Sequence, residues 1–101
     1  MKFELKEIRG QIRVTKVTCS RTLRSRNGGD AFVSLSSDLN GEEGMDIKSA
    51  RAAANMLSLE ADMACHEAIY GAGVIDGDTL NENIEGLKSR YARILKQKQD
   101  S

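Results

Sequence analysis

The chain lacks proline and tryptophan, and its 101 residues include two cysteines, one histidine and 4% aromatic residues. With so few aromatic side chains, the core must be built from aliphatic residues and methionine. No apolar run approaches the roughly 20 residues that a membrane-spanning helix needs. Residues 1–4 alternate in charge and lack the apolar stretch of a signal peptide, so we expect a cytoplasmic protein with no membrane contact.

The scarce reactive side chains argue against catalysis. Cys19 and Cys65 are far apart in the sequence, so we expect two buried free thiols rather than a disulfide. Asp62, Cys65, His66 and Glu67 suggest a metal or catalytic group, but zinc normally takes four ligands and no second histidine exists. Adjacent helix positions also point about 100° apart, which separates Cys65 from His66. We therefore expect no metal, no cofactor and no catalytic residue; an enzyme that uses His66 is the least favoured alternative.

The charge balance is zero only for the whole chain, with 15 basic and 15 acidic residues. Residues 1–30 carry eight basic and three acidic side chains, a local charge of +5, whereas residues 31–65 carry two and six, a local charge of −4. Such a dipolar molecule suits steering toward a charged partner by one face. It also suits a protein that merely stays soluble.

Residues 1–40 have the composition of a β-rich segment. The first apolar positions predict a short strand that ends or bulges at Arg9-Gly10, and β-branched residues concentrate between residues 11 and 25. Asn27-Gly28-Gly29 then predicts a hairpin. A three-residue loop there gathers most apolar side chains on one face. It pairs Leu23 with Val33, Cys19 with Ser37, and Val17 with Leu39.

The rest of the chain predicts two helices, over residues 46–70 and 79–98, with Asp46 capping the first and a Thr79–Glu82 capping box opening the second. Between them, Val74 and Ile75 are expected to pin the connection. The first helix has an alanine-rich seam, which predicts close contact with a second seam downstream. The two seams are Ile47, Ala50, Ala54, Leu57, Ala61, Ala64 and Ala68, and Leu80, Ile84, Leu87, Tyr91 and Ile94. We expect one α+β domain over residues 1–101, an antiparallel sheet of two or three strands on a helical hairpin.

The first helix carries a second apolar stripe, of Met56, Leu59, Met63 and Tyr70. A helix that is apolar on two sides is either sandwiched inside the domain or presented to a partner. We favour the sandwich. Pairing of the alanine seam between two chains, giving a homodimer, is left open.

The polar face of the hairpin is the first candidate binding surface. Arginines there could hold phosphates, Phe32 could stack on a base, and hydroxyl groups could add hydrogen bonds. The alternative is an ordinary solvated sheet face. The candidate residues are Ser20, Thr22, Arg24, Arg26, Phe32, Ser34 and Ser36. Arg21 falls on the opposite face of the predicted sheet.

The second candidate surface is acidic and lies between the sheet and the first helix. It consists of Asp38, Glu42, Glu43 and Asp46, which could meet a basic groove on another protein. The alternative is again a solvated loop.

Several features share an order with known small proteins. Cys19-Ser20-Arg21, the Asn27–Gly29 turn and the strand Phe32-Val33-Ser34-Leu35 are followed by Asp38-Leu39, an acidic loop and a helix. Over residues 18–68 this order resembles small uncharacterised proteins of bacteriophages and mobile elements. The resemblance implies a phage-type accessory protein, a class that includes nucleic-acid binders and inhibitors of host defence such as anti-CRISPR proteins.

These observations favour a small non-enzymatic binding protein. We expect it to bind a protein component of the nucleic-acid machinery or of host defence. If it belongs to the inhibitor class, it would also block that component. The alternative is a protein that binds single-stranded nucleic acid through Arg24, Arg26 and Phe32.

Overall fold

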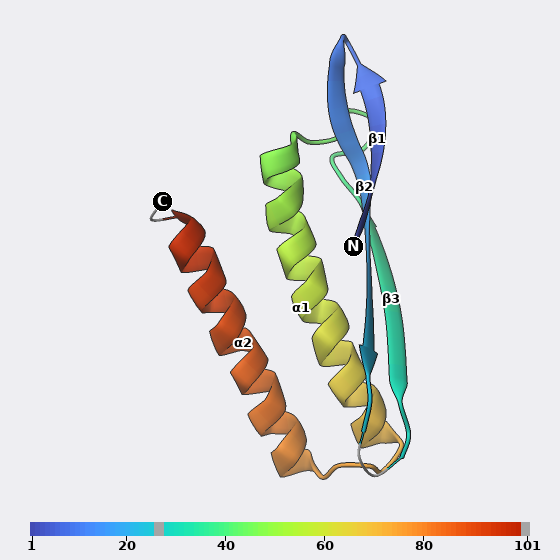
Figure 1. The fold of residues 1–101 in the computed structure, drawn as a ribbon, viewed down its shortest axis with the longest axis vertical. Helices are drawn as coiled ribbons and strands as arrows, with labels where there is room; N and C mark the ends of the chain where they lie inside the picture. Colours follow the sequence, from blue (N-terminus) through green and yellow to red (C-terminus); the bar gives the residue numbers. More distant parts are fainter. Residues whose placement is uncertain (26–27, 100–101) are drawn as a thin grey trace.

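The computed structural model describes residues 1–25 and 28–99 and has the α+β arrangement that the sequence predicts. Three strands, β1 (Lys2–Ile8), β2 (Gln11–Leu23) and β3 (Ala31–Asp38), precede two helices, α1 (Ile47–Gly71) and α2 (Gly77–Gln99). The elements form three layers, with α1 between the sheet and α2 (Figure 1). Within the described residues, no helix combines the length and apolar composition needed to cross a membrane.

The sheet is an antiparallel meander in the order β1-β2-β3. Ile8 pairs with Gln11, so only Arg9 and Gly10 form the first turn, with φ angles of 53° and 80°. A two-residue turn of this kind needs positive φ at both positions, because its twist must match that of the strands. The predicted end of the first strand at Arg9-Gly10 is therefore confirmed.

The predicted register of the second hairpin is wrong by two residues. The structure pairs Leu23 with Ala31, Cys19 with Leu35, and Val17 with Ser37. The connection between the strands is therefore residues 24–30, and its Asn27 lies outside the described part of the chain. A shift of two residues keeps every side chain on its predicted face, so the hydrophobic pattern alone cannot distinguish the two registers.

The alanine-rich side of α1 packs on the sheet rather than on α2, which corrects the predicted seam contact. Ala50 and Ala54 are buried against Val14 and Val17 of β2, in a cluster that Leu39 completes. Small side chains allow the helix backbone to approach the sheet closely, and this explains their burial. The ends of the predicted seam, Ile47 and Ala68, are exposed.

The second apolar stripe of α1 provides the contact with α2. Leu59 is buried with Leu87 and Tyr91 of α2, and Met63 packs against them. The sandwich interpretation is thus confirmed, although its two faces are exchanged relative to the prediction. Of the α2 seam residues, Ile94 has a side chain outside the described part of the structure.

Both helices begin at an aspartate. Asp46 occupies the N-cap of α1 as predicted, but its side chain makes no capping hydrogen bond there. The second helix begins two residues earlier than expected, because the carboxylate of Asp76 accepts a 2.8 Å hydrogen bond from the Thr79 N–H. This bond lowers the pKa of Asp76 and replaces the predicted Thr79–Glu82 capping box. Val74 and Ile75 pin the connection as expected, against Ala31, Cys65 and Ile69.

Candidate binding surface on the outer face of the sheet

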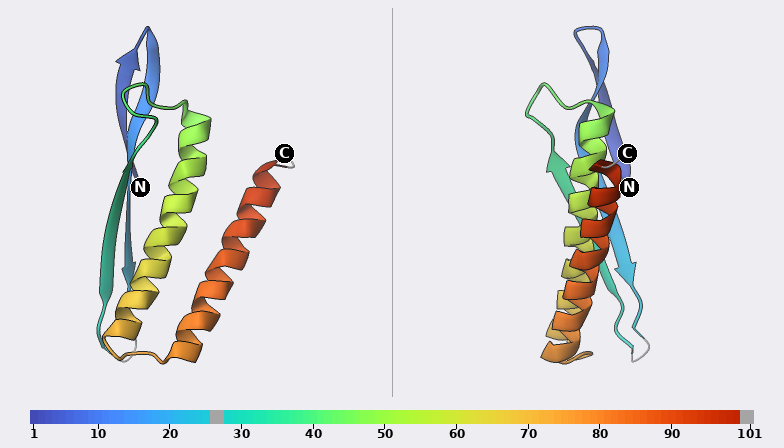
Figure 2. Two further views of the ribbon diagram at one scale, coloured as in Figure 1. Left: turned by 180° about the vertical axis from the view of Figure 1, so that it is seen from behind. Right: turned by 90° about the vertical axis from the view of Figure 1, so that its left-hand side faces the viewer.

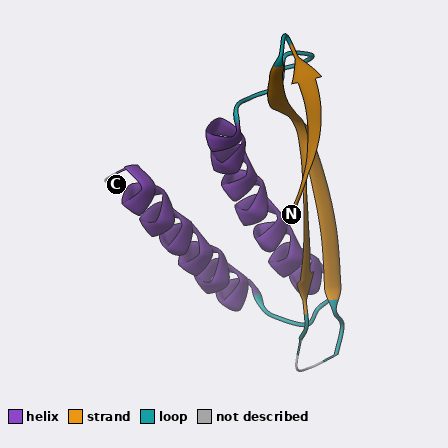
Figure 3. Ribbon diagram, turned by 45° about the horizontal axis from the view of Figure 1, so that its top comes forward, coloured by secondary structure: helices purple, strands orange, loops and turns teal. Residues whose placement is uncertain are grey.

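The sheet has one covered face and one bare face. Both helices lie on the same side of it (Figures 2 and 3), so we call that side the inner face and the opposite side the outer face. The inner positions of β2, such as Val17 and Cys19, are fully buried. Strand alternation places the intervening residues, Thr18, Ser20 and Thr22, on the outer face.

An exposed phenylalanine marks the outer face. Phe32 pairs with Thr22, and 69% of its surface is exposed. Next to it, Ser20 and Ser34 join their hydroxyl groups at 3.0 Å, and Thr18 and Ser36 do the same at 3.0 Å. Five predicted site residues, Ser20, Thr22, Phe32, Ser34 and Ser36, therefore lie together on one surface.

Charges of both signs border this surface. Lys16 pairs with Asp38 on one side and with Glu4 on the other, and Lys2 pairs with Thr18. Arg24 follows β2 and is exposed. Arg26, the other predicted arginine, lies outside the described residues. The centre of the outer face is thus uncharged and aromatic, while its margin carries lysine and arginine beside the acidic Glu4 and Asp38.

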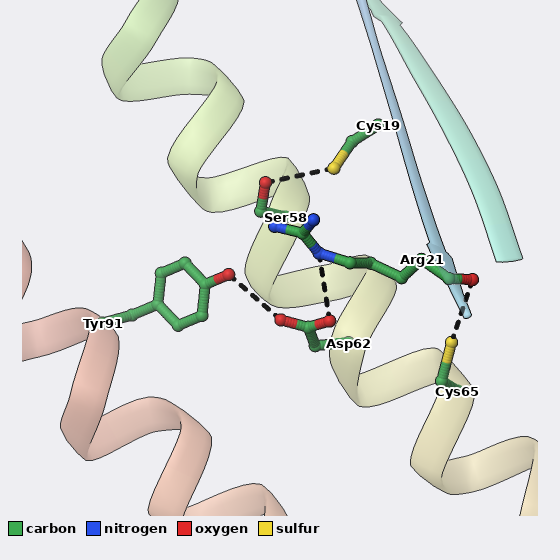
Figure 4. A network of polar contacts seen from close by, with 6 residues as sticks. All are labelled: Cys19, Arg21, Ser58, Asp62, Cys65 and Tyr91. Atoms are coloured by element: carbon green, nitrogen blue, oxygen red, sulfur yellow. Dashed lines mark hydrogen bonds and ion pairs between the residues drawn. The ribbon is translucent and has the colours of Figure 1, made fainter. Parts of the chain in front are cut away.

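Arg21 points the other way, as the alternation predicts, and joins the three layers. Its Nε lies 3.2 Å from the Asp62 carboxylate of α1, and the Tyr91 hydroxyl of α2 donates to the same carboxylate at 3.1 Å (Figure 4). The pKa of Arg21 is raised by its contact with the Tyr91 hydroxyl and by the negative charge of Asp62. Burial raises the pKa of Tyr91, so this phenol stays a hydrogen-bond donor. This link could not be predicted from the sequence, because its three members are far apart in the chain.

The two cysteines are buried free thiols, as predicted. Cys19 Sγ lies 3.1 Å from the Ser58 hydroxyl, and Cys65 Sγ donates to the Arg21 carbonyl at 3.6 Å (Figure 4). Burial raises the pKa of Cys65. A reactive cysteine needs the opposite shift, toward the thiolate, so this environment is typical of a structural thiol.

Asp62 and His66, which stand four residues apart on α1, have different partners. Asp62 is engaged by Arg21 and Tyr91, while His66 Nδ1 lies 3.4 Å from the Asn83 amide nitrogen of α2. His66 and Asn83 line a shallow depression between the helices. No group of three metal-ligating side chains occurs among the residues that the structure describes.

The four acidic candidates, Asp38, Glu42, Glu43 and Asp46, are all exposed in the segment from the end of β3 to the start of α1. Arg13 holds this acidic loop by donating to the carbonyl oxygens of Glu43 and Gly44, each at 3.2 Å. Gly44 has a φ of +67°, and a Cβ there would lie 2.8 Å from the Val14 carbonyl oxygen. Only glycine fits, because its backbone passes directly over β2.

Comparisons with known proteins do not assign this surface. Searches of protein-family models, of curated proteins and of solved structures each return no match to this chain.

Proposed function

We propose that this protein is a non-enzymatic binding protein that docks onto a protein of the nucleic-acid machinery, or of host defence, through the outer face of its sheet. The exposure of Phe32 on a face that no described element covers is the observation that carries the proposal. A large aromatic side chain in water gains most from burial in a partner's pocket, and such residues dominate binding energies at interfaces.

The surroundings of Phe32 support a protein as the partner. Its neighbours on the outer face, Thr22 and Ser34, are small and uncharged, while the charged Arg24 and Lys16 lie at the margin of this face. The cores of protein interfaces are depleted of charge in the same way. The acidic loop is the alternative docking surface, for a basic partner groove. The resemblance to phage accessory proteins supports the biological setting, and a cytoplasmic location belongs to the same proposal.

Paired aromatic variants test this proposal. Phe32→Ala removes the proposed anchor, whereas Tyr70→Ala removes an aromatic side chain, 47% exposed, from α1. The tagged proteins are incubated with bacterial lysate, and retained proteins are identified by mass spectrometry. We expect a partner that wild type and Tyr70→Ala retain and that Phe32→Ala loses. Equal retention by all three proteins, or an empty capture at native salt, would contradict the proposal.

Direct binding of single-stranded nucleic acid is the second candidate, favoured by the exposed Arg24 and by Lys2 and Lys16 around the outer face. Fluorescence anisotropy of a labelled single-stranded oligonucleotide is measured at low and near-physiological salt. This candidate predicts binding that weakens steeply with salt, since phosphate contacts release counterions, and that Arg24→Glu abolishes. No binding at low salt would exclude it.

A further inference from the structure

The two edge strands of the sheet differ in their protection against pairing with another strand. β1 carries charges at Lys2, Glu4, Lys6 and Glu7, and its register shifts between Glu4 and Leu5. Charged side chains of this kind block edge-to-edge pairing, and the register shift, with Thr15 as the extra residue of β2, adds local twist. β3 runs without a register shift and has no charged residue before its last position, Asp38. Its open edge is therefore a template for a further strand.

The backbone of β3 presents hydrogen-bonding groups along this edge. The Leu39 N–H donates to the Thr15 carbonyl of β2 at 3.0 Å. In an antiparallel ladder these directions alternate, so the N–H groups of Phe32, Ser34 and Ser36 point away from β2. No described element pairs with them, because β3 is the last strand of the sheet.

We propose that a second copy of this chain occupies the β3 edge, so that two β3 strands pair antiparallel and two sheets join into one of six strands. Identical strands can pair in this way about a two-fold axis. Val33 and Leu35, both half-buried, would then lie beside the same residues of the partner on the inner face. Because β3 is nearly uncharged, bringing two copies together places no charge at the centre of the contact.

The position of α1 fits this dimer. The helix packs on both β2 and β3. Strands lie about 4.8 Å apart, so a helix seated over these two strands lies about 5 Å from the two-fold axis. The two α1 axes would then be about 10 Å apart, close to the spacing of packed helices. The β3 strands can therefore pair and the α1 helices can pack in the same dimer.

The flank of α1 that would face the partner helix carries mostly small and apolar residues, with the exposed Glu60 at its solvent-facing margin, 40° around the helix from Ala64. Asp62 points toward β2, where it binds Arg21. Ala64, two positions later and about 200° around the helix, lies on the opposite flank, on the side of β3. The same flank carries Ala53, Leu57 and Ala68, and each is at least partly exposed. With Ala64 included, these residues follow one another at intervals of four, seven and four. Alanines there allow the close approach that the strand pairing requires.

The contacts along α1 also place the two-fold axis. Ala31, at the start of β3, packs with Cys65 and Ile69, whereas Leu39, just after β3, packs with Ala50 and Ala54. The middle of β3 therefore lies over the middle of α1, near residue 60. Antiparallel pairing about this point sets Leu57 against Ala64 of the second copy, and Ala53 against its Ala68. A large side chain thus meets a small one.

Sedimentation equilibrium over a range of concentrations tests the dimer. We expect wild type at twice the chain mass. Ala68→Arg places a bulky charge on the proposed flank, and Ala52→Arg is its control, because both alanines are exposed on α1 but face different directions. Ser34→Pro removes an outward N–H from the β3 edge without removing a β2–β3 bond.

The expected result is loss of the dimer in Ala68→Arg and in Ser34→Pro, with the dimer retained in Ala52→Arg and circular dichroism unchanged. If Ser34→Pro fails to fold, Ala68→Arg decides alone. A monomeric wild type at every concentration, or a dimer that Ala68→Arg does not weaken, would overturn the proposal. Phe32→Ala leaves this dimer intact, because its side chain lies on the outer face, so failure of the proposed function and failure of the dimer are distinguishable.

Discussion

The two helices have similar lengths but different roles in the fold. α1 packs on the sheet with one side and on α2 with another, whereas α2 packs on α1 and meets β2 through the contact of Tyr91 with Arg21. Ala50, Ala54 and Ala61 of α1 are almost completely buried, while α2 buries Leu87 and Tyr91. α1 and the sheet therefore form the main core of the domain, and α2 is an outer layer that contributes the separate cluster of Leu59, Leu87 and Tyr91.

The largest effect is expected where α1 meets the sheet. Ala54→Asp buries an unpaired carboxylate at a position with 1% exposure, which should cost more than about 4 kcal/mol of unfolding free energy. Ala52→Asp, two positions away and exposed, should stay within about 0.5 kcal/mol of wild type. Urea denaturation measures both variants. Similar unfolding free energies for Ala54→Asp and Ala52→Asp would show that the alanine-rich side of α1 is not part of the core.

A smaller and local effect is expected at the contact with α2. Leu87→Ala removes a buried side chain from the cluster with Leu59, at a cost of roughly 2–4 kcal/mol. Hydrogen exchange should show faster exchange in α2 and unchanged protection in β2 and α1. Lys88→Ala, an exposed neighbour, is the control. Uniform loss of protection across all elements would mean that α2 belongs to the same cooperative unit as the sheet.

The smallest effect is expected at the polar link between the layers. Tyr91→Phe keeps the ring but removes the hydroxyl that donates to Asp62, with an expected cost of about 1–2 kcal/mol. A double-mutant cycle with Asp62→Asn, followed by thermal denaturation, isolates the coupling between the two groups. Strict additivity would mean that the hydrogen bond contributes nothing to holding α2 on α1.

The sequence predicts the elements of this fold more reliably than their contacts. Periodicity and β-branched residues located all three strands and both helices, and alternation placed Phe32 and Arg21 on opposite faces of the sheet. The partner of the alanine seam was predicted wrongly, because a sheet and a helix both favour small residues at a close contact. The register was off by two residues, since such a shift leaves each face unchanged.

The candidate site was predictable to the same degree. Five outer-face residues were placed correctly because strand alternation is a local rule. The Arg21–Asp62–Tyr91 link was not predicted, because it depends on how α1 and α2 pack on the sheet. Asp76 was missed as a cap because Thr79 offered a capping pattern of its own. Non-local packing decides what the local pattern leaves open.

The buried thiols make the protein its own conformational reporter. Cys19 and Cys65 lie at the contact between α1 and the sheet, with 0% and 1% of their surfaces exposed. A thiol reagent can reach them only when that contact opens, so the rate of modification counts openings of the native fold. A partner that stabilises the contact between α1 and the sheet would slow the modification of the two native cysteines. A partner that separates α1 from the sheet would accelerate it.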